Sequence, residues 1–202
     1  MSNLITKRRE PFRFMVWLGI ASSLLFFTIL LATYVIRRTA SDWADVKLPM
    51  VFLVSTIAIV LSSLTLHNAN SAFRHERFSN YRMNMATTLA LGTLFIILQA
   101  WGWRQMLRSG VKLAGNPSAD FVYIISGVHL LHILIGLILL AVVLAEALRR
   151  RPYIDSFVYS VNPPNLLKIK LITLYWHFVD ILWVGLFVFL LIHQGLDLSL
   201  SL

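Results

Sequence analysis

Long apolar runs alternate along the chain with short polar segments that are rich in Lys and Arg. Each run has about the 20 residues that one bilayer crossing requires. In hydrocarbon only helices and closed barrels satisfy every backbone hydrogen bond, and no run shows the alternation of a barrel strand. The pattern predicts an all-α membrane bundle that forms a single domain over residues 1–202. Its five expected transmembrane helices are 14–36, 48–66, 83–103, 121–145 and 171–196.

Segments rich in Pro and Asn precede the last two apolar runs. In "NPSAD" (116–120), Ser118 is a candidate N-cap for the fourth helix, and "NPPN" (162–165) precedes the fifth. No internal repeat and no soluble domain is apparent. The whole chain is expected to form one bundle.

The composition supports a membrane protein. The 202 residues are 58% hydrophobic and 13% charged, whereas a soluble domain is about half apolar and a quarter charged. The chain has no Cys, which excludes disulfides, iron–sulfur clusters and thiolate-bound copper or zinc. The net charge of +9 raises the possibility of nucleic-acid binding, but the basic residues gather at the ends of apolar runs. No nucleic-acid partner is therefore expected.

The distribution of Lys and Arg predicts the orientation in the membrane. The N-terminal tail and the loops around 74–82 and 149–170 lie on one side and carry twelve of the 18 basic residues. The positive-inside rule then places the N-terminus in the cytoplasm and the C-terminus outside. The first run is too long for a signal peptide and lacks a cleavage site, so we expect it to be retained.

Ionisable side chains inside predicted membrane helices are candidates for function, because each costs about 2.5–3.5 kcal/mol to insert. The fourth expected helix contains two histidines and the fifth contains a His and an Asp three residues apart. A glutamine lies near the end of the third. These residues are His129, His132, His177, Asp180 and Gln99.

Residue chemistry alone leaves three interpretations of these residues open. Haem ligation by two histidines fits poorly, because His132 and His177 differ in depth by roughly 9 Å while axial nitrogens lie about 4 Å apart. An ion or proton path is a second interpretation, but a five-helix transporter without inverted repeats is atypical. The third is an internally hydrogen-bonded pair, His177 and Asp180, that fixes helix packing. Physical arguments favour the third.

Four collinear stretches resemble subunit III of haem–copper respiratory oxidases. "YWHFVDILW" (175–183) resembles the last-helix signature of that family. "FVYIISGVHLLHILIGLILL" (121–140) resembles a helix that typically reads close to TGxHGLHVxxG. "LGTLFIILQAW" (91–101) and "RFMVWLGIASSLLFFTILLATYVIRR" (13–38) resemble two further family helices. Five spans match the shorter form that is common in bacteria.

The resemblance implies a non-catalytic accessory subunit in the bacterial inner membrane. It would lie beside subunit I, with subunit II and a larger respiratory supercomplex as further partners. Haem and copper are then expected in the partner subunits, and none in this chain. The complete "YWHFVD" favours cytochrome c over quinol as the electron donor. A small ion transporter and a b-type haem protein remain the alternatives.

The family also implies bound phospholipid, in a cleft between the first two helices expected here and the other three. Two family glutamates are absent, since Ser23 and Gly102 stand in their places. This puts direct proton relay by this chain in doubt. The family pattern also implies that His129 faces the helix of Ser23. Expected lipid contacts are Trp17, Trp43, His67 and Arg82.

Overall fold

The computed structural model describes residues 10–39, 43–149, 154, 157 and 162–197. Five of its helices are long and apolar enough to cross a membrane, which confirms the predicted all-α membrane fold. Each helix overlaps one of the predicted spans. The helices are α2 (Glu10–Arg37), α3 (Val51–Arg74), α4 (Phe78–Arg108), α5 (Pro117–Arg149) and α7 (Pro163–Gln194).

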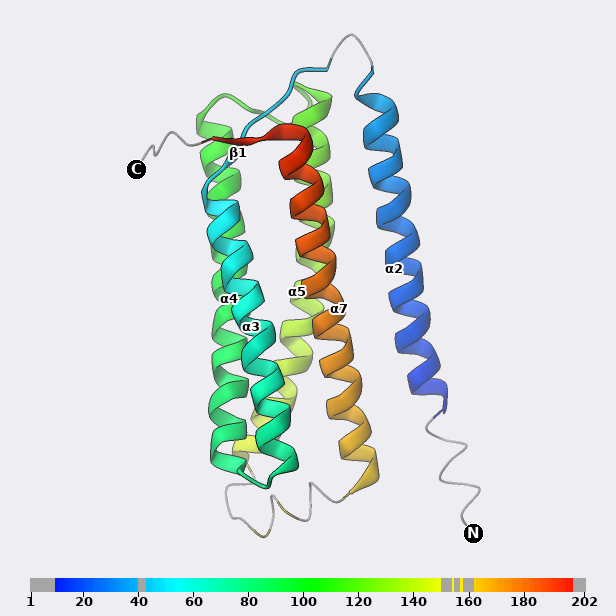
Figure 1. The fold of residues 1–202 in the computed structure, drawn as a ribbon, viewed down its shortest axis with the longest axis vertical. Coiled ribbons are helices and arrows are strands. Elements are labelled where there is room, and N and C mark those ends of the chain that lie inside the picture. The colour runs from blue at the N-terminus through cyan, green and yellow to red at the C-terminus, as the bar shows by residue number, and fades with distance from the viewer. Residues whose placement is uncertain (1–9, 40–42, 150–153, 155–156, 158–161, 198–202) are drawn as a thin grey trace.

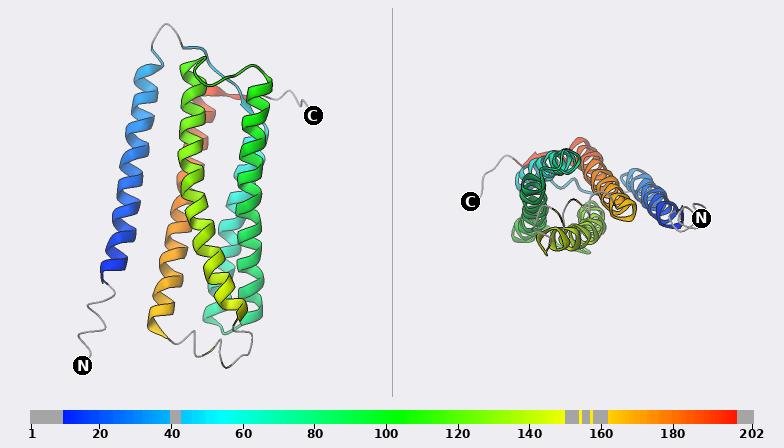
Figure 2. Two further views of the ribbon diagram at one scale, coloured as in Figure 1. Left: turned by 180° about the vertical axis from the view of Figure 1, so that it is seen from behind. Right: turned by 90° about the horizontal axis from the view of Figure 1, so that it is seen from below.

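Four of the helices, α3, α4, α5 and α7, form a bundle, and α2 packs on its outside against α5 and α7 (Figures 1 and 2). We expected a cleft that separates α2 and α3 from the other three helices. This expectation is wrong, because α3 packs along α4. Only residues 75–77 connect α3 to α4, and so short a connection makes two helices antiparallel neighbours. The long connection from α2 allows that helix to lie apart from α3.

The second predicted span, 48–66, is shifted toward the C-terminus in the structure, where α3 runs from Val51 to Arg74. Leu48 and Pro49 instead form β1, which pairs in parallel with β2, Leu196–Asp197. Proline disfavours the helical conformation in the residue before it, which accounts for the later start. The polar C-terminal part of α3 remains helical because backbone hydrogen bonding continues beyond the apolar run.

Asn116, and not Ser118, caps the start of α5. Its Oδ1 accepts from the Ser118 backbone N–H at 3.0 Å, and its carbonyl accepts from Asp120 N–H at 3.1 Å. Both bonds are those of an N-cap residue. The prediction for Ser118 is therefore wrong, because Ser118 is already inside the helix.

The last helix starts at "NPPN", before the predicted span 171–196, and it also ends earlier than that span. Proline occupies the first positions of α7, where the missing N–H would have no intrahelical partner anyway. The helix ends at Gln194 because Gly195 has a φ of 73°, in the left-handed region that favours glycine.

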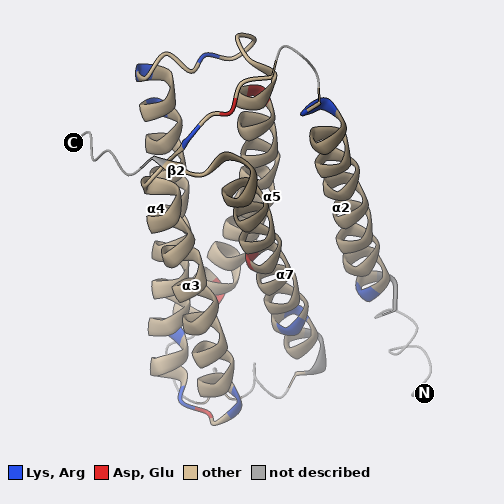
Figure 3. Ribbon diagram, turned by 45° about the horizontal axis from the view of Figure 1, so that its top comes forward, with Lys and Arg blue, Asp and Glu red and all other residues tan. Residues whose placement is uncertain are grey.

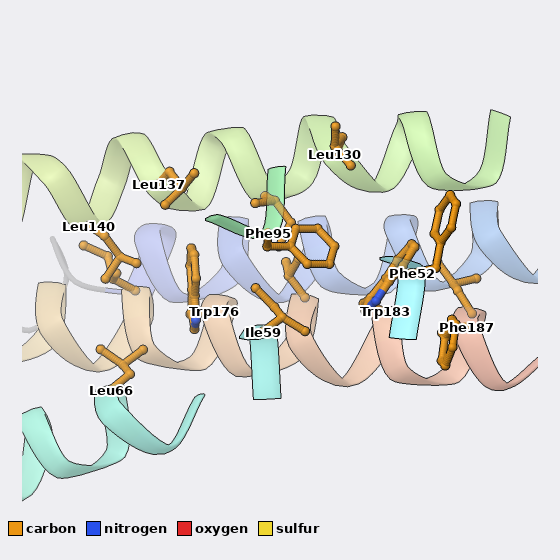
Figure 4. Packing of buried hydrophobic residues seen from close by; sticks show 14 of the residues in the cluster. Phe52, Ile59, Leu66, Phe95, Leu130, Leu137, Leu140, Trp176, Trp183 and Phe187 are labelled. Carbon is orange, nitrogen blue, oxygen red and sulfur yellow. The ribbon is translucent and has the colours of Figure 1, made fainter. Parts of the chain in front are cut away.

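Two fully buried tryptophans of α7, Trp176 and Trp183, occupy the centre of the bundle (Figure 4). Trp176 contacts α4 and α5 at glycines, since a Cβ at Gly92 or Gly136 would lie 2.7 or 2.9 Å from its ring. Its Nε1 donates to Ser62 Oγ of α3 at 3.1 Å. Small residues on three helices thus let α7 approach closely.

Lys and Arg lie at the two ends of the bundle (Figure 3), as expected for membrane-spanning helices. Arg37 and Arg108 are in the last turns of α2 and α4, while Arg74 and Arg149 are in the last turns of α3 and α5 at the opposite end. Which end faces the cytoplasm stays a prediction.

Candidate functional site

His177 of α7 is half-buried at the seam with α3. Its Nδ1 lies 2.6 Å from Ser63 Oγ, at hydrogen-bonding distance. Neither a hydrogen bond nor an ion pair joins His177 to Asp180, so the predicted pair is wrong. Residues three apart on a helix differ in direction by about 60°, which is enough here to give the two side chains different surroundings. His177 lies toward the surface of the seam, and Asp180 points into the bundle.

Asp180 is 3% exposed, and neither carboxylate oxygen has a hydrogen-bond partner among the described residues. The Ser63 hydroxyl lies near the carboxylate, but the geometry of a hydrogen bond is not met. Asp180 was expected to face protein, and this is confirmed. The expectation that it has a hydrogen-bond partner is wrong for the chain as described.

His129 of α5 is completely buried among aromatic rings. Its ring lies 4.9 Å from Trp183 at an interplanar angle of 31°, and 5.9 Å from Phe95 at 83°. Neither ring nitrogen has a hydrogen-bond partner in the described part of the chain. His129 thus points toward α4 and α7, and the expectation that it faces the helix of Ser23 is wrong.

His132, and not His129, contacts α2. Its Nδ1 lies 2.9 Å from the Val128 carbonyl and its Nε2 lies 3.0 Å from Ser23 Oγ. A carbonyl only accepts, so Nδ1 carries the proton that is donated to it. With the proton on Nδ1, the Ser23 hydroxyl donates to Nε2. One interhelical hydrogen bond therefore connects α2 to α5 near the middle of both helices.

A second polar group, at the C-terminal end of α2, was not predicted from the sequence. Gln194 Oε1 accepts from the Val46 backbone N–H at 2.7 Å and from Ser118 Oγ at 3.0 Å. Gln194 Nε2 donates to the Tyr34 hydroxyl at 2.8 Å. All four residues are buried, so Gln194 joins α2, the α2–α3 connection and α5. A glutamine directly after an apolar run was the only available signal.

Serines and threonines of α3 provide most of the other buried polar contacts. Gln99 Nε2 of α4 donates to Ser55 Oγ at 2.9 Å, and Trp183 Nε1 donates to Thr56 Oγ1 at 3.0 Å. These contacts fix how α3 is rotated against α4 and α7. Among the described residues, no group of three His, Cys, Asp or Glu side chains is arranged to hold a metal ion.

A sequence profile for the family described as cytochrome c oxidase subunit III matches residues 6–194. The chain belongs to this family. It is 25% identical over 177 residues to "Probable quinol oxidase subunit 3" of Staphylococcus saprophyticus, with 85% of this chain and 83% of the relative covered. "Probable cytochrome c oxidase subunit 3" of Nocardia farcinica and "Cytochrome c oxidase subunit 3" of Thermostichus vulcanus are each 28% identical. Those matches cover 85% and 86% of this chain, and 82% of each relative.

Membership of the subunit III family confirms the resemblance and makes the chain a multi-pass accessory subunit of a haem–copper oxidase complex. The structure also describes the two positions, Ser23 and Gly102, at which the resemblance implied a glutamate. Ser23 lies against His132, in the contact between α2 and α5. At Gly102 a Cβ would come within 2.7 Å of the Phe52 ring, so this position is closed by α3 and has no space for a longer side chain.

The expected lipid contacts of this subunit III lie in different surroundings. Trp17 is 58% exposed and His67 is exposed, whereas Arg82 is half-buried. Trp43 is partly covered, with its ring 4.9 Å from that of Tyr34. Trp43 therefore packs at the C-terminal end of α2, and the other three remain candidates for lipid contact.

Proposed function

We propose that this subunit III carries no redox centre and supports catalysis by a haem–copper subunit I, beside a copper-bearing subunit II. The observation that carries the proposal is the family match across residues 6–194, which includes all five membrane helices. Bacterial relatives that carry the names of cytochrome c and quinol oxidase subunits support a place in the bacterial inner membrane. Membership of a larger respiratory supercomplex is part of the same proposal.

The arrangement of the intramembrane histidines supports an accessory role. His132 is directed at Ser23 of α2, whereas His177 is directed at Ser63 of α3. Axial ligation of haem would need two imidazoles that face each other across one iron. The two contacts point to different helices, so these residues fit helix packing better than haem ligation.

Bound phospholipid is a second part of the proposal. Only 11% of the most apolar window of α2 is buried, compared with 39% in α3, α5 and α7. Such an apolar surface must be covered by lipid or by another membrane subunit. We place phospholipid along α2, with Trp17 near it, and lipid headgroups near His67 and Arg82.

Purification of the native complex tests this function. An affinity tag on this chain should recover a larger haem-bearing subunit in mild detergent. The Soret absorbance should follow the amount of that subunit in every fraction. A pure single chain with a stoichiometric Soret band would contradict the accessory role, and ion transport by the chain alone in liposomes would favour the transporter alternative.

Turnover with two electron donors tests the type of oxidase. We propose cytochrome c as the donor, because "YWHFVDILW" is complete here. The purified complex should oxidise reduced cytochrome c faster than a quinol. Native mass spectrometry of the same preparation should show retained phospholipid, and the retained amount should fall with Arg82→Gln.

A further inference from the structure

Asp180 presents a polar group that the protein itself does not satisfy. The residue is 3% exposed, and both carboxylate oxygens are without a hydrogen bond from the described residues. Buried polar atoms in proteins nearly always have a partner, which is protein or ordered water. The free oxygens of Asp180 therefore point to a bound ligand.

The Ser63 hydroxyl cannot complete the hydrogen bonding of this carboxylate. Ser63 lies near Asp180 but is 2.6 Å from His177 Nδ1. A serine hydroxyl has one proton, whereas two carboxylate oxygens offer about four acceptor positions. Even with the Ser63 proton directed at Asp180, most acceptor positions would remain open.

One side of Asp180 is closed by apolar side chains. Trp176, Val179 and Trp183 on its own helix are almost completely buried, as is Ile59 of α3. Ser63 and His177 are only partly buried. The approach to the carboxylate is therefore from the seam between α3 and α7.

Polar side chains continue along this seam toward the α3–α4 turn. His67, one turn along α3 from Ser63, is exposed. Further along, Asn70 Nδ2 of α3 donates to Thr173 Oγ1 of α7 at 2.9 Å. By contrast, the exposed side chains in the middle of α5 are all aliphatic: Leu131, Leu134, Ile135, Ile138, Leu139 and Val142.

We propose that Asp180 is the inner end of a hydrated seam between α3 and α7, and that ordered water bound to its carboxylate reaches it from the α3–α4 end. Water supplies the donors that the protein lacks. The same water can also form hydrogen bonds with the Ser63 hydroxyl and with the partly exposed His177. A buried water typically makes about three hydrogen bonds to such groups. The site takes water and needs no metal.

Cysteine substitution tests the hydration of the seam, because the chain has no cysteine of its own. The variants Ser63→Cys and Thr173→Cys are prepared in the native oxidase complex in lipid nanodiscs. Each is treated with a small cationic methanethiosulfonate, and labelling is read from the mass of this chain. The control is Ile135→Cys, which is exposed and lies at the depth of Trp176, since its neighbour Gly136 contacts that ring.

Thiolates form and react where water is present, so both seam cysteines should be labelled roughly tenfold or more faster than the control. Equal rates at all three positions would overturn the proposal. A second measurement does not depend on variants. A high-resolution structure of the unmodified complex should show water within hydrogen-bonding distance of Asp180, and a carboxylate there that contacts only protein atoms would also overturn it.

Discussion

Alanine at position 136 should destabilise the bundle through one identifiable contact. Gly136 of α5 lies against the Trp176 ring, and an added Cβ would be 2.9 Å from its Cε3. The ring cannot move far in the opposite direction, because its other edge already lies against Gly92 of α4. The extra methyl group therefore forces α5 and α7 apart, or moves the tryptophan out of its rotamer.

The expected size follows from two opposing effects. Overpacking of a well-packed core costs about 1–3 kcal/mol. Alanine in a helix is favoured over glycine by about 0.8–1.0 kcal/mol. Gly185→Ala in α7 is the matched control, because nothing lies within 4 Å of its added Cβ. The gain in helix propensity is common to both variants. The difference between their stabilities therefore isolates the contact with Trp176.

The assay is thermal dissociation of this subunit from the purified oxidase, followed on native gels after heating. For a chain of this size, about 1 kcal/mol corresponds to roughly 2–4 °C in the midpoint. Gly136→Ala should therefore dissociate at least about 2 °C below Gly185→Ala. In a Trp176→Phe background the effect of Gly136→Ala should shrink, because the smaller ring leaves room. Equal midpoints for the two alanine variants would refute the packing argument.

Three further substitutions test the polar contacts. Gln194→Leu leaves a buried backbone N–H and a tyrosine hydroxyl unpaired at about 1–3 kcal/mol each, so protease should cut segment 43–49 faster than in the unmodified protein. Ser23→Ala removes one interhelical hydrogen bond with His132, worth about 0.6–2 kcal/mol, and turnover over many cycles should be unchanged; rapid inactivation would contradict this. His177→Leu frees the Ser63 hydroxyl to bond within its own helix, so the dissociation midpoint should fall by less than it would if a hydrogen-bonding group were left unpaired. Failure of the complex to assemble would show that His177 has a larger role.

The number and type of membrane helices could be read from the sequence, but their ends could not. Hydropathy reports where the chain crosses hydrocarbon, whereas caps and proline decide where backbone hydrogen bonding starts and stops. The third predicted span, 83–103, accordingly extends to Phe78–Arg108 as α4. Leu48 was assigned to a helix because it is apolar, yet it is fully buried in a short strand.

The residues of the polar core were identified from the sequence more reliably than their partners were. His132 and His177 do make interhelical contacts, but with Ser23 and Ser63. Small hydroxyl side chains barely change the hydropathy of a helix, so nothing in the pattern marks them as partners. Which of two histidines three residues apart meets α2 depends on the rotation of α5, and that rotation is set by packing around Trp183.

The parallel pairing of β1 with β2 has a consequence for the order in which the protein is assembled. Leu48 N–H donates to the Gly195 carbonyl at 3.0 Å, so the segment that precedes α3 is held by residues that are made only after α7. The helix α2 likewise packs on α5 and α7, both of which are synthesised after it. The α3–α4 hairpin can pack as soon as it is inserted, while α2 has no packing partner until α5 and α7 have been inserted. During biogenesis α2 therefore waits in the bilayer, and a chain truncated before α5 leaves it undocked.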